Sequence, residues 1–309
     1  MRYLKIYVIL VGTMIVWGFN VSFIKILVGH FMPATITALR IFTAAATVFL
    51  FLGLSRSIRL PHAGEWKYVF GGALSSVVAH HYFLAEGLTE TSATNAGLIL
   101  GLGPLLTALL AAVLLRRRPT FIRFIGFILG GVGVGFTVLA GSEGMGALSA
   151  GDADIFLSIL AQALSFILIR KAAETLDPRL LTGYMLFFGS LILFLISLWK
   201  EPDGLASLAG APMLTWFIFI CSAVFATAVG HMIYNYAIGQ IGAAETSIFM
   251  NLSTFFSLMG AAVILGETIL PSHFIGLLFI ISGVLLGSGS LEELILQKRH
   301  SRLRAEKRS

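Results

Sequence analysis

Charged residues are scarce in this chain of 309 residues: Asp, Glu, Lys and Arg make up only 12% of it, and 57% of the residues are hydrophobic. A soluble domain carries roughly 25% charged residues. So few charges cannot cover a surface that faces water, so we expect most of the surface to face lipid. Ten spans of about 20 apolar residues would use about 200 residues. No separate soluble domain fits in what remains.

Cysteine is also scarce, and the motifs of enzymes are missing. The single cysteine, Cys221, excludes a disulfide framework and a cysteine-based metal site within the chain. A glycine-rich run at residues 130–135 lies inside an apolar segment, where it cannot cradle a phosphate, and there is no Walker lysine motif. The neighbouring His80 and His81 lack the further ligands of a zinc site. We therefore predict no enzyme activity, no catalytic residue, no metal and no cofactor.

Apolar segments separated by short connections predict ten antiparallel transmembrane helices. Prolines mark the starts of several spans, where a missing N–H costs little, and only Pro104 lies deep inside one. With Gly101 and Gly103 beside it, we expect a kink or hinge at Pro104. The predicted spans are residues 7–28, 33–54, 66–88, 92–115, 120–140, 152–171, 178–199, 212–239, 242–265 and 272–290.

The distribution of basic residues predicts the orientation. If the N-terminus is cytoplasmic, the connections on that side hold most of the 21 Lys and Arg residues, and acidic residues gather on the other side. We therefore predict a multi-pass protein of the cytoplasmic (inner) membrane with both termini in the cytoplasm. The basic tail, residues 291–309, would lie near anionic headgroups. The net charge of +6 does not indicate nucleic-acid binding, because the basic residues are not placed like a nucleic-acid surface.

The chain repeats itself with an offset of about 150 residues. The matched pairs include Trp66 with Trp216, His81 with His231, Ala93 with Ala243, Gly126 with Gly276, and Gly133 with Gly283. We predict two five-helix units at residues 1–145 and 146–290. Because five is odd, the second unit enters the membrane from the other side. This inverted arrangement is typical of secondary transporters, whose sites lie near the membrane midplane between the repeats.

Polar side chains within the spans are the candidate site residues, because a polar group in hydrocarbon needs a partner or a water-filled cavity. Helical spacing places several of them on shared faces of the first, third, sixth and eighth spans. The predicted substrate-binding or cavity-lining residues are Trp17, Asn20, His80, His81, Tyr82, Gln162, His231, Tyr234 and Asn235. The predicted gating or structural residues are Arg40, Glu86, Pro104 and Glu245.

Two histidines stand out among these candidates. Counting the helical rise from Trp66 and Trp216 places His81 toward the outer half of the cavity and His231 toward the inner half. Histidine can bind a substrate or carry a proton near neutral pH. The alternative is that each is a neutral residue that hydrogen-bonds between helices. Arg40 could bind a substrate carboxylate, reach the outer interface or pair with Glu86.

Short motifs in both halves carry a resemblance to a known family: Trp17-Gly18-Phe19-Asn20, Ala38-Leu39-Arg40, Thr91-Ser92-Ala93, Gly103-Pro104 and Gly266-Glu267. With these motifs the sequence resembles the EamA family of the drug/metabolite transporter superfamily over nearly its whole length. The resemblance implies a ten-helix exporter of metabolites that in some members uses a proton or ion gradient, and the family includes an exporter of aromatic amino acids. The chain departs from the family pattern at Arg116-Arg117 and at Ser253-Thr254.

Together these features predict a secondary transporter that exports amino acids or related small metabolites by alternating access. Nucleosides, sugars or drugs are the alternative substrates, and an intramembrane enzyme or a membrane scaffold are the alternatives from other classes. The expected partners are a small-molecule substrate, the bilayer and a coupling proton. The glycine face at Gly126, Gly130 and Gly133 favours close helix packing within a monomer over homodimerisation.

Overall fold

A computed structural model describes residues 4–114, 120–141 and 149–287, and these residues form helices and no strand. Arg116, Arg117 and the predicted basic tail, residues 291–309, lie outside the described residues. The helices are α1 (Leu4–His30), α2 (Pro33–Leu54), α3 (Trp66–Gly72), α4 (His80–Glu90), α5 (Ala93–Leu100), α6 (Gly103–Leu114), α7 (Phe121–Gly141), α8 (Ala150–Ala172), α9 (Pro178–Lys200), α10 (Met213–Ile220), α11 (Gly230–Ile241), α12 (Ala243–Ile248), α13 (Met250–Leu265) and α14 (Pro271–Gly287). Two π-helical segments, η1 (Ala73–Ala79) and η3 (Cys221–Val229), and a short 3₁₀ turn, η2 (Ala206–Leu208), complete the order.

Within the described residues these elements join into ten helical rods, as the sequence predicts. Seven of the rods are long and apolar enough to cross a bilayer, and α14 and the first part of α7 (Phe121–Gly133) are shorter apolar helices. Pro33, Pro178 and Pro271 are the first residues of α2, α9 and α14. These prolines fall at the position where a missing N–H costs least.

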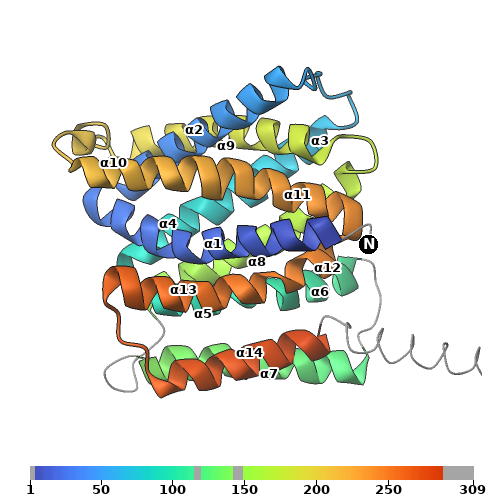
Figure 1. Ribbon diagram of the computed structural model, residues 1–309, viewed down its shortest axis with the longest axis vertical. Coiled ribbons are helices and arrows are strands. Elements are labelled where there is room, and N and C mark those ends of the chain that lie inside the picture. Colours follow the sequence, from blue (N-terminus) through green and yellow to red (C-terminus); the bar gives the residue numbers. More distant parts are fainter. Residues whose placement is uncertain (1–3, 115–119, 142–148, 288–309) are drawn as a thin grey trace, which may run out of the picture.

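The rods lie side by side across the molecule, and equivalent helices of the two halves meet (Figure 1). Helix α2 packs on α9, its counterpart in the second half, and α7 packs on α14 in the same way. These two pairs form opposite edges of the bundle (Figure 1). The two five-helix units are therefore inverted repeats around an axis between them. We call the end of the bundle where α1 begins the N face, and the other end the opposite face.

Two of the ten rods contain a π-helical segment at matching positions. Segment η1 ends at Ala79 and η3 ends at Val229, and these residues are related by the 150-residue offset. The next helix begins at once in each case, so that His81 and His231 are both the second residue of their helices, α4 and α11. Single π-helical turns are rare and are found frequently at functional sites.

Two glutamates fasten the opposite face by capping helices of the other repeat. Glu201, which follows α9, accepts hydrogen bonds from the backbone N–H groups of Ala34 and Thr35 at 2.8 and 2.7 Å. Glu267 accepts from Ala93 and Thr94 at the start of α5, both at 2.9 Å. Each carboxylate also accepts the hydroxyl of the threonine that it caps. A carboxylate at a helix N-terminus satisfies free N–H groups and the helix dipole together.

A glycine ends α13 in the conformation that the second of these clamps needs. Gly266 has a φ of 68°, in the left-handed region, and the N–H of Glu267 bonds to the carbonyl of Ala261 at 3.0 Å. Residues with a side chain rarely adopt this backbone conformation, which commonly terminates helices. The Gly266-Glu267 motif therefore stops one helix and caps another.

On the N face, an ion pair ties the α2–α3 connection to the second repeat. Arg59 binds Glu65 through two parallel hydrogen bonds of 2.8 and 2.9 Å, and it also donates to the carbonyl of Thr175. The hydroxyl of Tyr184 donates to the carbonyl of Arg59. The hydrogen bonds from Arg59, helped by the N–H of His62, lower the pKa of Glu65 to about 2.

This ion pair makes a testable contribution to the pH dependence of stability. Because the pKa of Glu65 is lower in the folded state, its contribution is complete above the unfolded pKa of about 4.3 and is lost as the pH falls toward 2. We expect wild type to melt at a higher temperature than Glu65→Gln at pH 7, and the difference to shrink below about pH 4. Melting curves of purified protein between pH 7 and pH 3 measure this.

The control is Glu174→Gln, which removes an exposed carboxylate at the same face. A difference between wild type and Glu65→Gln that stays constant over the whole pH range would contradict the assignment.

Helices α7 and α14 approach so closely that glycine is required on both. A Cβ atom at Gly126 would lie 2.3 Å from the backbone nitrogen of Gly287, and one at Gly283 would lie 2.5 Å from that of Gly130. Real Cβ contacts are essentially never shorter than 3.0 Å. The glycine face predicted from the sequence is therefore occupied by α14 of the same chain.

Candidate functional site

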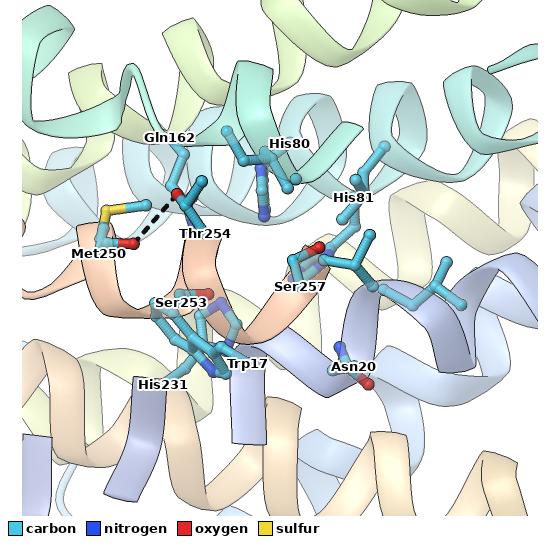
Figure 2. A pocket seen from close by; sticks show the side chains of 15 residues that line it. Trp17, Asn20, His80, His81, Gln162, His231, Met250, Ser253, Thr254 and Ser257 are labelled. Carbon is cyan, nitrogen blue, oxygen red and sulfur yellow. Dashed lines mark hydrogen bonds between the residues drawn. The ribbon is translucent and has the colours of Figure 1, made fainter. Parts of the chain in front are cut away.

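A cavity, partly open to the outside, lies between the repeats near the centre of the bundle (Figure 2). Its walls come from α1, α4, α5, α8, α11 and α13, so both repeats build it. No Asp, Glu, Lys or Arg side chain is among the described residues that line it. The apolar part of the wall includes Val21, Ile24, Leu84, Leu100 and Met250.

Three histidines form a cluster on the cavity wall (Figure 2). The ring centroids of His80 and His81 are 4.7 Å apart, and those of His81 and His231 are 5.3 Å apart. The expectation that His81 and His231 occupy different halves of the cavity is therefore wrong. It assumed a regular α-helical rise from Trp66 and Trp216, whereas η1 and η3 each interrupt that rise with wider π-helical turns.

Two fully buried ring nitrogens of this histidine cluster have no hydrogen-bond partner among the described residues. They are the Nε2 atoms of His81 and His231, whose side chains are 3% and 7% exposed. The Oδ1 atom of Asn20 and the hydroxyl of Ser257, on α1 and α13, are also buried and unpaired. Unpaired buried polar groups are costly, so these four atoms are available to hydrogen-bond to water or to a ligand in the cavity.

Arg40 lies directly behind the histidine cluster. Its guanidinium donates to the hydroxyl of Thr227 at 2.7 Å and to Nδ1 of His81 at 3.3 Å. The side chain is only 1% exposed, so it does not reach the interface. It does not pair with Glu86 either: that carboxylate lies 3.7 Å from the ammonium of Lys200. Arg40 thus joins α2 to both π-containing rods.

Trp17 closes the side of the cavity next to His231. Its indole N–H donates to the carbonyl of Ala226 at 2.8 Å, and its ring lies 4.9 Å from the ring of His231. A Cβ atom at Gly230 would lie 2.5 Å from Trp17 Nε1. By the internal repeat Gly230 corresponds to His80, so the second half carries a glycine where the first carries a histidine because Trp17 fills that space.

The cavity wall holds six of the nine residues for which the sequence predicts a cavity-lining role: Trp17, Asn20, His80, His81, Gln162 and His231. The other three lie elsewhere. Tyr82 points toward the opposite face, where its hydroxyl accepts from Lys200. Tyr234 is fully buried behind Trp17, and Asn235 donates to Thr182 at 2.9 Å.

The residues predicted to act in gating or structure lie outside the cavity wall. Pro104 is the second residue of α6, just after the fourth rod breaks at Gly101 and Leu102. Glu245 is exposed in the first turn of α12, where its charge suits the helix N-terminus. Glu86 and Lys200 link α4 to α9 at the opposite face.

Helix α13 also lines the cavity, and none of its cavity residues was predicted from the sequence. Met250, Ser253, Thr254 and Ser257 line it from this helix, and Gly97 faces them from α5. A signal was available, because Ser253-Thr254 is one of the two departures from the family pattern. Hydroxyls in place of the usual residues change the chemistry of a cavity wall.

The fold and this cavity define a membrane transporter built from two inverted repeats. The EamA-like transporter family matches residues 4–139 and 149–289, and the chain belongs to this family. It is 31% identical to the "Uncharacterized transporter YyaM" of Bacillus subtilis, with 94% of this chain and 95% of that protein aligned. It is 27% identical to an "Uncharacterized transporter" of Archaeoglobus fulgidus over 85% of this chain and 91% of that one.

More distant similarity extends to plants and to a solved structure. The "WAT1-related protein At3g02690, chloroplastic" of Arabidopsis thaliana is 23% identical over 87% of this chain and 66% of its own length. A crystal structure with 17% identity superposes with a TM-score of 0.66, covering 93% of this chain and 97% of that one. The latter similarity supports the fold.

Proposed function

We propose that this protein is a secondary transporter that exports amino acids with apolar side chains, or closely related small metabolites, by alternating access. The observation that carries the proposal is the cavity between the repeats, which combines an apolar wall with unpaired Nε2 atoms on His81 and His231. The apolar side chain of the substrate would contact Val21, Ile24 and Leu84, and its polar end would form hydrogen bonds with the Nε2 atoms of the two histidines. Two similar, inverted halves can exchange conformations, which is how such carriers expose one site to each side in turn.

The orientation belongs to the same proposal. Both termini would lie in the cytoplasm, by the distribution of basic residues, and the N face would be cytoplasmic. In the structure the opposite face is fastened by Glu201 and Glu267, which join the two repeats. The transporter would load substrate from the cytoplasm when the cavity opens at the N face, and a proton moving the other way would drive export.

Replacing the cavity histidines should abolish most transport. A thermal-shift screen with amino acids, nucleosides and sugars selects ligands that stabilise the folded protein, and counterflow in proteoliposomes then measures transport of those that do. We expect leucine or phenylalanine to stabilise the protein and to show counterflow. We expect His81→Gln and His231→Gln each to reduce this counterflow about tenfold or more. Removing a hydrogen bond that a buried polar partner depends on costs about 1–3 kcal/mol, and 1.4 kcal/mol is a factor of ten.

The matched control is His273→Gln. His273 is also buried with an unpaired Nε2, but its Nδ1 bonds to the backbone of Leu270 at the start of α14, away from the cavity. Normal counterflow by both cavity variants would disprove the proposed site.

Other functions give different results in the same experiments. Stabilisation and counterflow by nucleosides, sugars or drugs, and not by amino acids, would replace the substrate class. Chemical conversion of a stabilising ligand would indicate an intramembrane enzyme, and binding without counterflow would indicate a membrane scaffold. The inverted repeat favours a carrier, because an enzyme needs an asymmetric site.

A further inference from the structure

In each cavity histidine, the hydrogen bond made by Nδ1 determines whether Nε2 can donate a hydrogen bond to a substrate or accept one from it. A neutral imidazole has one nitrogen that donates and one that accepts. The partner of Nδ1 therefore fixes the state of Nε2, which is the atom left unpaired at His81 and His231. The three histidines of the cluster have different partners, so they need not present the same group.

His81 must present a donor. Its Nδ1 is 3.3 Å from Nη2 of Arg40. A guanidinium carries only N–H donors, so Nδ1 has to accept and the ring proton resides on Nε2. A doubly protonated His81 would point an N–H at the N–H of Arg40, so this contact also keeps the ring neutral.

His231 must present an acceptor. Its Nδ1 is 3.0 Å from the carbonyl oxygen of Thr227, one helical turn earlier. A carbonyl oxygen can only accept, so Nδ1 carries a proton, and in the neutral ring Nε2 is a bare nitrogen.

His80 reaches the same state through a hydroxyl. The Ser158 hydroxyl donates its one proton to the carbonyl of His80 at 2.8 Å. The 2.8 Å contact between that hydroxyl oxygen and Nδ1 of His80 must therefore be donated by the histidine. Its Nε2 is then bare as well, and no described residue bonds to it.

We propose that the cluster is a tautomer code: His81 donates one N–H, while His231 and His80 offer two bare nitrogens. Building on the proposed function, this code fits an α-amino acid, whose carboxylate would accept from His81 and whose ammonium would donate to His231 and His80. The buried charge of Arg40 favours a substrate carboxylate at the cluster, because Arg40 has no carboxylate partner among the described residues.

Arg40 is thus a positioning residue for the cavity. It does not line the wall, yet it decides which proton His81 carries and supplies the charge that a substrate carboxylate would balance. The bond to Thr227 holds it in place.

Nitrogen-15 NMR of protein labelled at histidine tests the code without any substrate. The shifts of Nδ1 and Nε2 distinguish the two neutral tautomers and the charged ring, and His80→Gln, His81→Gln and His231→Gln assign the signals. Within the cluster we expect protonated Nε2 at His81 alone, and protonated Nδ1 at His80 and His231. Protonated Nδ1 at His81, bare Nδ1 at either of the other two, or a charged ring at neutral pH would overturn the proposal.

The variant Arg40→Met tests the positioning role. It removes the donor, so we expect the His81 signals to shift toward a mixture of tautomers while those of His80 and His231 stay unchanged. Thr227→Val is the control, because it removes the other partner of Arg40 but keeps the carbonyl that holds His231. An unchanged His81 in Arg40→Met would refute this role, and if that variant does not fold, the wild-type spectrum still decides the code.

Three probes test the assignment of the substrate ends: phenylalanine, 3-phenylpropionate, which lacks the ammonium, and 2-phenylethylamine, which lacks the carboxylate. We expect each truncated probe to bind at least about tenfold more weakly than phenylalanine, because a site that hydrogen-bonds a group rejects the analogue without it. Equal binding of 2-phenylethylamine would refute the carboxylate position at His81. If none of the three binds, the proposed amino acid substrate fails, whereas the spectra alone settle the tautomers.

Discussion

Gly126→Val should prevent stable folding or lower the melting temperature by about 5–10 °C, the largest effect on stability that we expect from one substitution. The new Cβ would lie 2.3 Å from the backbone nitrogen of Gly287 and 2.7 Å from the carbonyl oxygen of Gly283. Backbone atoms cannot swing aside as a flexible side chain can. Helices α7 and α14 would have to separate, and their pairing forms one edge of the bundle (Figure 1).

Gly131→Val is the matched control on the same helix. A Cβ at Gly131 would meet nothing within 4 Å, so this variant has the same change in helix propensity without the clash. Size-exclusion profiles and melting curves of detergent-solubilised protein measure both variants. Equal behaviour of the two would show that the close approach of α7 and α14 does not stabilise the fold.

Glu267→Ala should loosen the opposite face and produce the largest effect on conformation. The change removes two backbone hydrogen bonds of 2.9 Å and one from the hydroxyl of Thr94, all to a charged group. Such bonds contribute about 1.5–3 kcal/mol each, so the balance between the fastened and the open state should shift by tenfold or more. Spin labels at the exposed positions Thr268 and Thr89, on the two sides of this clamp, measure the opening.

In wild type we expect one narrow distance distribution between these labels, and in Glu267→Ala an added population at longer distance. Glu90→Ala is the control, since Glu90 is an exposed carboxylate at the same face that makes no side-chain hydrogen bond within the described residues. Identical distributions in all three proteins would rule out a role for Glu267 in holding the face closed.

The sequence predicts the ten rods well, because the signals for them are additive and local. Long apolar runs, prolines at helix starts and the offset of 150 residues all agree, and α2, α9 and α14 begin at the prolines that mark them. The inverted arrangement then follows from counting five helices per unit.

The π-helical segments within the rods could not be predicted from the same signals, unlike the break in the fourth rod beside Gly101, Gly103 and Pro104. Segment η1 has the sequence ALSSVVA and η3 has CSAVFATAV, and neither contains a proline or glycine. An extra residue in a turn leaves no mark in hydropathy. The register beyond each π-helical segment is therefore uncertain from sequence, which is why the predicted depths of His81 and His231 were wrong.

The cavity position of Gln162 was predictable because a large polar side chain lies there within an apolar span. Cavity residues were not predictable where one helix face carries several candidates. Tyr234 and Asn235 fall on the same predicted stripe as His231, but they pack behind Trp17 and against Thr182. The choice depends on neighbouring helices, which one sequence does not place.

The matching π segments bear on how this molecule arose. Ala79 and Val229 end them at equivalent positions, and each is followed within two residues by the histidine of its half. Two independent insertions at the same site would be a coincidence, so the economical history has one extra residue in a single ancestral unit. The gene for that unit then doubled, and both descendants kept the irregular turn. The histidine that became His81 and His231 would then be older than the ten-helix chain itself.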